Sequence, residues 1–181
     1  MVYLRAGVDR DQLRAAQRPI KDRYQADPEA ALFTLHAEGD LDEQEVACSV
    51  QTARGLIAAG LHPGTGGSGM LACSGDMLLQ ALVACAGVTI RSVAISLDIP
   101  VSGSVRAEGD LDFRGTLGIK GGDQVPVGFQ AIRLSFELNS DAPEEQLARL
   151  MELTERYCVV YQTLRGGVPI TITRSVGASA R

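Results

Sequence analysis

Apolar and polar residues alternate along four segments of the chain, and a period of two is the pattern of a half-buried β-strand. These segments are residues 31–41, 46–52, 105–114 and 132–138. A short acidic turn separates the first two, which predicts an antiparallel hairpin. In the third segment the alternation places four side chains toward the core: Val105, Ala107, Leu111 and Phe113. Residues 169–174 predict a last strand that closes the domain.

A long apolar segment, residues 74–98, predicts a central helix, because a helix that is apolar on nearly every side must be covered on most faces. Ser74 is a good N-cap, and Asp76 in the first turn suits the positive end of the helix dipole. The helix is expected to end before Pro100.

A second, amphipathic helix is predicted for residues 141–166. It begins with the capping-box pattern Asp141-x-x-Glu144 and ends at a pair of glycines that starts with Gly166. Its apolar face includes Cys158, which therefore points toward whatever this helix covers.

The order of these elements, β-β-α-β-β-α-β, predicts an α+β fold, since the strands come in hairpins rather than in βαβ units. Residues 9–24 carry a weaker helical stripe that Pro19 interrupts, which predicts two short turns or a kinked helix. We therefore divide the chain into an N-terminal helical extension, residues 1–30, and a single domain, residues 31–181.

Composition and charge narrow the class of protein. The chain has 181 residues, enough for one domain with a hydrophobic core, and 45% of them are apolar. Its net charge of −5 and isoelectric point of about 5.0 argue against nucleic-acid binding by a basic face. The N-terminus has no pattern of a targeting segment, and Arg91 interrupts the longest apolar segment, so no membrane span is expected. We expect a cytoplasmic protein whose four cysteines are reduced at rest.

The sequence lacks the context that a dinucleotide-binding site or a metal site requires. Residues 64–69 formally match the dinucleotide pattern G-x-G-x-x-G, but no strand comes directly before them and the predicted helix starts only at Ser74. The chain has no C-x-x-C or H-x-x-x-H pair, and its two histidines, His36 and His62, lie apart. We expect neither a bound cofactor nor a metal, and we interpret the glycine-rich segment, residues 60–73, as a flexible loop over a pocket.

Cys85 and Cys158 are the candidate reactive residues, because each lies in a predicted buried helix and two such helices of a small domain are expected to touch. A thiol that meets a second thiol and a basic residue can carry out redox chemistry. A buried cysteine is also an ordinary small apolar residue, and the patterns alone leave both interpretations open. Cys48, on the inward side of a strand, and Cys73 are expected to take no part.

Two motifs surround these cysteines: Ser74-GDMLLQALVACAGVTI-Arg91 and Thr154-ERYCVVYQT-Leu164. Together they resemble the OsmC/Ohr family of thiol-dependent hydroperoxide-reducing proteins. Members of that family carry a pattern like S-P-x-E-L-L-L-A-A-L-x-x-C on a central helix and a second cysteine in a pattern such as A-E-x-x-C-P-V-S. The resemblance extends from about residue 31 to residue 174 and includes the strand order. It implies antiparallel sheets wrapped around paired central helices in an intertwined homodimer, with active sites at the subunit interface.

The resemblance also implies roles for individual residues. Cys85 corresponds to the thiol that attacks the peroxide, and Cys158 to the thiol that resolves the product as a disulfide. Arg54 is the nearest match to the arginine that supports the thiolate, and Asp76 stands where family members have a glutamate. Val159 replaces the proline after the second cysteine, so nothing in the sequence forces a helix break beside Cys158.

The function that this resemblance implies is the reduction of organic hydroperoxides, with the disulfide then reduced by a dithiol or a lipoylated reductant. The residues expected around Cys85 are apolar and favour an organic hydroperoxide over hydrogen peroxide: Met77, Leu78, Leu82 and Val88. Two alternatives stay open. One is a binding module that holds a small hydrophobic ligand at the dimer interface without turnover. The other is a redox sensor whose disulfide changes a surface for a partner.

Overall fold

The computed structural model describes residues 9–26, 38–41, 47–52, 55–117 and 125–175. Its helices are α1 (Arg10–Ala26), the short 3-10 helix η2 (Pro63–Thr65), α2 (Ser74–Leu97), α3 (Phe113–Thr116), α4 (Glu144–Tyr157) and α5 (Val159–Gly166). Its strands are β1 (Glu38–Leu41), β2 (Ala47–Thr52), β3 (Gly55–Gly60), β4 (Ala72–Cys73), β5 (Ser102–Leu111) and β6 (Phe129–Asn139). This mixture of helices with mainly antiparallel strands is the predicted α+β class.

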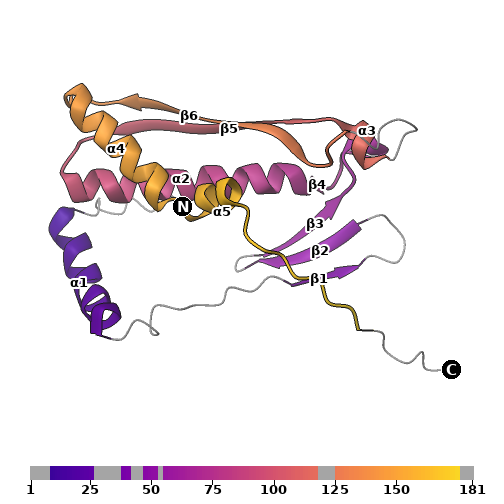
Figure 1. Cartoon of the computed structure of the whole chain (residues 1–181), viewed down its shortest axis with the longest axis horizontal. Coiled ribbons are helices and arrows are strands. Elements are labelled where there is room, and N and C mark those ends of the chain that lie inside the picture. Colours follow the sequence, from indigo (N-terminus) through magenta and orange to yellow (C-terminus); the bar gives the residue numbers. More distant parts are fainter. Residues whose placement is uncertain (1–8, 27–37, 42–46, 53–54, 118–124, 176–181) are drawn as a thin grey trace.

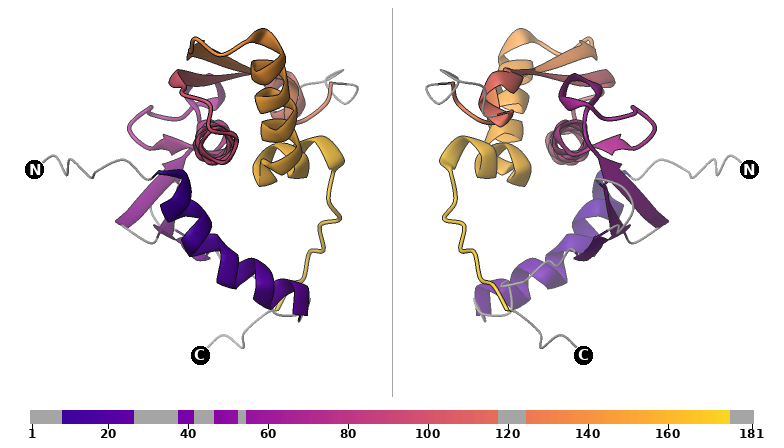
Figure 2. Two further views of the ribbon diagram at one scale, coloured as in Figure 1. Left: turned by 90° about the vertical axis from the view of Figure 1, so that its left-hand side faces the viewer. Right: turned by 90° about the vertical axis from the view of Figure 1, so that its right-hand side faces the viewer.

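Helix α2 is the centre of the molecule. It runs beneath the long hairpin β5–β6, with α4 and α5 on one side and the sheet β1–β3 on the other (Figures 1 and 2). The main core lies between α2, the start of β5 and α4: Ile90, Val93, Ala94, Ile99, Val101, Leu150 and Leu153. Leu150 is fully buried, and burying a leucine side chain contributes ~2 kcal/mol to folding.

One side of α2 is nevertheless uncovered in the single chain. Among the described helices, α2 alone is long and apolar enough to cross a membrane by composition, a test that core helices also pass, and only 28% of that stretch is buried. Val88, in the middle of the helix, has 72% of its side chain exposed. The rest of this apolar surface therefore lacks cover within the described part of the chain.

The first sheet has the strand order β1–β2–β3–β4. Strands β1 and β2 pair antiparallel, which confirms the predicted hairpin in the part that the structure describes. Strand β3 also pairs antiparallel with β2 and was not predicted, because its small residues do not alternate with polar ones. Part of the predicted loop is ordered structure: η2 lies within it, and β4 pairs parallel with β3 just before α2.

The second sheet is the antiparallel hairpin β5–β6. Val105 lies opposite Phe136 and Ala107 opposite Leu134, so the predicted inward faces of both strands meet. The register shifts between Asp110 and Leu111, and this bulge ends the alternation. The predicted inward placement of Leu111 and Phe113 in one strand is therefore wrong: Leu111 is 37% exposed, and Phe113 begins α3.

Both predicted helix caps are wrong, although both helices exist. Helix α2 includes Ser74, and its N-cap residue is Cys73, which makes no side-chain capping bond. Helix α4 begins at Glu144 after Pro143, rather than at Asp141. The reason is a local turn before α4, where the Ser140 hydroxyl accepts a hydrogen bond of 3.2 Å from the Ala142 amide.

The predicted last strand is also absent from the described residues, since residues 168–175 contain no strand. The segment leads away from the body of the protein (Figure 1). Ile170 and Ile172 are 85% and 90% exposed. A strand needs a partner, and no described strand of this chain lies alongside the segment.

Of the two predicted alternatives for the N-terminal segment, two short turns or a kinked helix, the structure has a single helix, α1, with Pro19 inside it. Arg10 at its start forms an ion pair of 3.7 Å with Asp98, which caps the C-terminal end of α2. Cationic groups are favoured at that end of a helix. The division into an extension, residues 1–30, and a domain, residues 31–181, remains a prediction.

Candidate functional site

The structure brings Cys85 and Cys158 together. Cys85 lies in the middle of α2 and is half-buried, and Cys158 lies between α4 and α5 with 1% of its surface exposed. Both helices pack against α2. The two thiols are in hydrogen-bonding contact with each other. The predicted meeting of these cysteines is therefore a feature of the fold.

The helical conformation is interrupted at Cys158. Helix α4 ends at Tyr157 and α5 starts at Val159, while Cys158 itself has extended backbone angles, φ −73° and ψ 105°. The sequence predicted one unbroken helix, since Val159 stands where the family has proline, and this prediction is wrong. The break leaves the first amides of α5 without partners inside the helix, and two of them are directed at Cys85.

These groups and their neighbours shift the pKa of the Cys85 thiol. Burial raises its pKa, but the amide of Val160, the thiol of Cys158, the amide of Val159 and the hydroxyl of Thr89 all lower it, and the net pKa lies below the ordinary 9.0. A thiolate that accepts several hydrogen bonds is favoured over the thiol. Cys85 is therefore the better nucleophile of the pair.

The pKa of Cys158 is shifted in the opposite direction. Burial raises the pKa of its thiol, the amide of Tyr161 lowers it, and the hydrogen bond to Cys85 and the charge on Cys85 raise it, so the net pKa lies above 9.0. Two acidic groups in contact cannot both ionise easily. Of the two thiols, Cys85 is therefore the one that ionises first, and Cys158 keeps its proton to higher pH.

Thr89 is a functional residue that the sequence analysis missed. It lies one turn beyond Cys85 on α2, and its hydroxyl is among the groups that lower the pKa of both thiols. It also donates a hydrogen bond of 2.8 Å to the carbonyl oxygen of Cys85. A threonine within an apolar helix is ordinary, but its spacing of four residues from Cys85 places both on one helical face.

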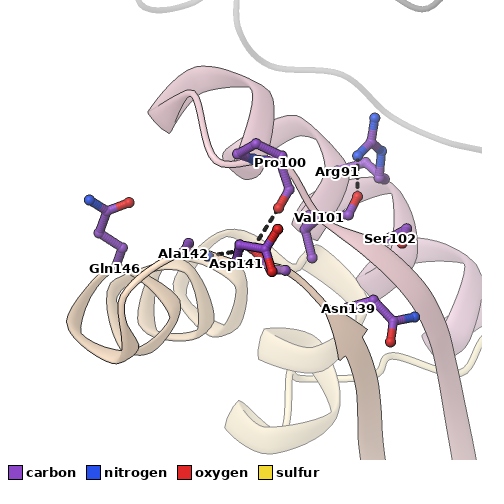
Figure 3. A pocket seen from close by; sticks show the side chains of 9 residues that line it. Arg91, Pro100, Val101, Ser102, Asn139, Asp141, Ala142 and Gln146 are labelled. Atoms are coloured by element: carbon purple, nitrogen blue, oxygen red, sulfur yellow. Dashed lines mark hydrogen bonds between the residues drawn. The ribbon is translucent and has the colours of Figure 1, made fainter.

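Arg54, predicted to support the thiolate, lies outside the described residues, so its role stays a prediction. Two other arginines, Arg91 and Arg133, bind groups other than the cysteines. Figure 3 shows the guanidinium of Arg91 turned toward Val101, whose carbonyl oxygen accepts a hydrogen bond of 2.8 Å from Nη1. This pair borders a groove of about 720 Å³ toward the C-terminal end of α2. Arg133 pairs with Asp110 on the exposed side of the β5–β6 hairpin.

Asp76 lies in the first turn of α2, as predicted, but the structure does not bring it to Cys85. Nine residues of helix separate them, which is about 13.5 Å along the axis. Asp76 instead lines a small cavity with His62 and Cys73. The His62 imidazole has a local structural role there, because its Nδ1 accepts a hydrogen bond from the Gly64 amide at 2.9 Å.

A cavity of about 450 Å³ with a largely apolar wall lies between β6 and the helices α2, α4 and α5, and neither cysteine lines it. It is bordered by Leu82, one turn before Cys85, and by Tyr161, one turn after Cys158. The inward side chains of β6 form much of its wall: Phe129, Ile132, Leu134 and Phe136. Glu155 and Arg165 add charge, and the Tyr161 hydroxyl donates a hydrogen bond of 3.3 Å to Glu155. Such a cavity suits an organic rather than an ionic ligand.

The chain was compared with known families and structures. A family model described as OsmC-like protein matches residues 67–173. No curated protein matches the chain. The crystal structure of an OsmC like protein from Mycoplasma pneumoniae is similar, with a TM-score of 0.60 and 18% identity over 75% of this chain and 89% of that one.

Two further solved structures share the fold. The organic hydroperoxide resistance protein OsmC from Legionella pneumophila has a TM-score of 0.53 and 19% identity over 75% of this chain and 92% of that one. The organic hydroperoxide resistance protein OhrB of Bacillus subtilis has a TM-score of 0.51 and 18% identity over 76% and 94%. At these identities the similarity establishes the fold.

Proposed function

The chain belongs to the OsmC-like protein family, and on this premise we propose that it is a thiol-dependent peroxidase that reduces organic hydroperoxides. Cys85 is the peroxide-attacking thiol and Cys158 the resolving thiol. The observation that carries the proposal is the contact between the two thiols, combined with a lowered pKa for Cys85 and a raised pKa for Cys158. These opposite shifts give the two cysteines different chemical roles.

The proposed reaction has two steps. The Cys85 thiolate attacks the distal oxygen of the hydroperoxide, the O–O bond breaks, and the alkoxide takes a proton and leaves as an alcohol. Cys85 is then a sulfenic acid. The Cys158 sulfur displaces the hydroxyl of that acid, which leaves as water after protonation, and a disulfide forms. A dithiol or a lipoylated reductant then restores both thiols.

The cavity bordered by Leu82 and Tyr161 supports an organic substrate. Leu82, which borders it, is 2% exposed and holds the apolar wall one turn from Cys85. The names of the Legionella pneumophila and Bacillus subtilis proteins point to the same substrate class. Burial of an organic group there is favourable by about 25 cal/mol for each Å² of apolar surface removed from water.

We also propose that the protein acts as an intertwined homodimer in the cytoplasm. Much of α2 is uncovered in the single chain, and so are Ile170 and Ile172. The β5–β6 sheet has only two strands, and such a sheet is marginal without further strands. A second copy would cover α2, pair with the C-terminal segment that carries Ile170 and Ile172, and extend the two-stranded sheet.

Two residues complete the proposal. We propose that Arg54 adds a cation to the amides that already support the Cys85 thiolate. Asp76 acts on the site only from a distance or from the other subunit, because the helix separates it from Cys85 within one chain.

Sustained consumption of cumene hydroperoxide in the presence of dithiothreitol tests the proposal. The expected result is many turnovers for each protein chain, with loss of activity when both thiols are blocked beforehand. A binding module would bind the hydroperoxide in the apolar cavity but consume none. A redox sensor would form the disulfide once and show no rapid turnover.

A further inference from the structure

The break between α4 and α5 takes one backbone carbonyl away from its usual partner. The hydrogen-bond ladder of α4 ends with the bond from the Cys158 amide to the Thr154 carbonyl oxygen, at 3.0 Å. In an unbroken helix the next bond would join the Val159 amide to the Glu155 carbonyl oxygen, because each amide donates to the carbonyl four residues earlier. The extended backbone of Cys158 instead makes Val159 the first residue of a new helix.

A side chain of α5 takes the place of that amide. Nε2 of Gln162 donates a hydrogen bond of 2.7 Å to the Glu155 carbonyl oxygen. The backbone amide of Gln162 donates to the Cys158 carbonyl oxygen at 2.9 Å, which is the i to i−4 bond of the first turn of α5. Gln162 is therefore part of the new helix and also occupies the acceptor that α4 would need in order to continue.

The local sequence contains no other cause of the break. Residues 155–162 include neither glycine nor proline. Sharp interruptions of a helix arise at such residues, at π-bulges, or where a side chain inserts into the backbone ladder. The Gln162 side chain, bonded to a carbonyl of that ladder, is an insertion of this kind.

The bond from Gln162 is specific to the broken arrangement. Seven residues separate Gln162 from Glu155, and in one continuous helix they would span about 10.5 Å along the axis, beyond the reach of a glutamine side chain. The carbonyl oxygen of Glu155 would then bond to the Val159 amide. The two arrangements thus compete for one acceptor, and the Gln162 side chain favours the broken one.

We propose that Gln162 is a positioning residue that holds α4 and α5 apart at Cys158 by occupying the Glu155 carbonyl oxygen. This inference rests on the proposed function, in which Cys158 and the first turn of α5 must face Cys85. Helix α5 packs against α2, which carries Cys85. In a continuous helix the first amides of α5 would bond to carbonyls of α4 and would be unavailable to the Cys85 sulfur.

Gln162→Met tests the inference, because methionine has a similar helix propensity and an unbranched side chain but no donor. Gln162 is exposed, so the change removes little packing. The ratio of broken to continuous conformers is expected to fall about fivefold, as for loss of one ordinary hydrogen bond. The Cα chemical shifts of Cys158 and Val159 should move toward helical values, and NMR relaxation dispersion measures the population of the minor conformer.

Tyr161→Phe is the matched control. The Tyr161 hydroxyl bonds to the same residue of α4, but to Oε2 of Glu155, at 3.3 Å, rather than to its carbonyl oxygen. Loss of this bond leaves the carbonyl occupied by Gln162, so the Cα shift of Cys158 and the minor-conformer population are expected to stay as in wild type.

Val159→Pro provides a rescue background. Proline has no amide to donate, so the continuous arrangement gains nothing when the Glu155 carbonyl oxygen is released. Adding Gln162→Met to Val159→Pro is therefore expected to change neither the Cα shift of Cys158 nor the minor-conformer population. After cumene hydroperoxide is added, disulfide formation should be slower in Gln162→Met than in wild type, and equal in Val159→Pro with and without Gln162→Met.

Unchanged Cα shifts and conformer populations in Gln162→Met would overturn the proposal, as would an equal change in Tyr161→Phe or in the Val159→Pro background. A changed population with wild-type disulfide formation would overturn the role of Gln162 in the reaction. The NMR measurements involve no peroxide. The expected NMR changes, together with a wild type that consumes no cumene hydroperoxide, would support the role of Gln162 in the helix break and count against the peroxidase, so the two failures are distinguishable.

Discussion

The backbone amide of Val160 donates a hydrogen bond to the sulfur of Cys85, which joins the first turn of α5 to the middle of α2. The amide of Val159 does the same. Helix α5 has no side-chain cap, so the Cys85 sulfur takes the place of the capping oxygen that such a helix usually has. Formation of the thiolate and the position of α5 are therefore coupled.

Replacing Val159 with proline removes one of these two donors. Proline is well accepted at the first position of a helix, and Cys158 before it already has the extended angles that a following proline requires. The pKa of Cys85 is expected to rise, because one hydrogen bond to the charged form is lost. Site-resolved alkylation against pH measures this shift.

The control is Val159→Ala, which keeps the amide. The Val159 side chain is 71% exposed, so its truncation removes little packing. Equal profiles for the proline and alanine variants would mean that the amide of Val159 does not support the thiolate.

The opposite pKa shifts of the two thiols predict an opposite dependence of stability on pH. The folded pKa of Cys85 is lowered, so its contribution to the unfolding free energy grows as pH rises from that folded value to 9.0 and is lost as pH falls through it. The folded pKa of Cys158 is raised, so its contribution is full below 9.0 and is lost as pH rises through the folded value.

Urea unfolding of wild type and Cys85→Ser at several pH values checks this dependence. The difference in unfolding free energy between them is expected to increase in favour of wild type as pH approaches 9.0 from below. A difference that stays flat with pH would show that the Cys85 pKa is the same in the folded and unfolded chains.

Alternation of apolar and polar residues was sufficient to predict β6 and most of β5, because each has one buried face. It failed at Leu111, where a bulge shifts the register, and at β3, whose small residues carry no alternation. It also predicted a strand at residues 169–174 that has no partner within the described chain. Pairing is a tertiary event, and a strand pattern does not identify the strand that will pair with it.

The candidate site was predicted in part. The two cysteines were found from their motifs, but Val159 was interpreted only as a missing proline. The sequence contains no sign that its amide would be used as a donor, because backbone groups are the same in every residue except proline. Thr89 was missed for a related reason: a hydroxyl in an apolar helix usually bonds to its own backbone, and only the fold brings Cys158 near it.

Arg54→Ala is predicted to raise the pKa of Cys85 while the fold stays intact, because only a cation near the thiolate is removed. Alkylation rate against pH is again the measurement. Arg133→Ala is the matched control, since Arg133 pairs with Asp110 on an exposed face. If the Arg54 variant has the wild-type profile, the thiolate is supported by the α5 amides and the Thr89 hydroxyl without this arginine.

The homodimer predicts a role for the exposed C-terminal segment. Replacing both Ile170 and Ile172 with glutamate is expected to convert the protein to monomers, because charged side chains at these 85% and 90% exposed positions cannot be buried against a second copy. Light scattering at micromolar concentration measures the mass. Valine at both positions keeps the apolar surface and should keep the dimer. A folded wild-type monomer at that concentration would contradict the proposal.

The roles of the two cysteines give the last prediction. Cys85→Ser is expected to abolish peroxide consumption, because a serine hydroxyl is not ionised near neutral pH and no other nucleophile is proposed. Cys158→Ser should still react once and leave a sulfenic acid that dimedone traps. Oxidised wild type should show a Cys85–Cys158 disulfide by peptide mass, since the two thiols already touch in the reduced state. Full activity in Cys85→Ser would leave the binding module as the better interpretation. Wild-type turnover in Cys158→Ser would make the protein a one-cysteine peroxidase, with Cys158 as a core residue that only tunes the pKa of Cys85.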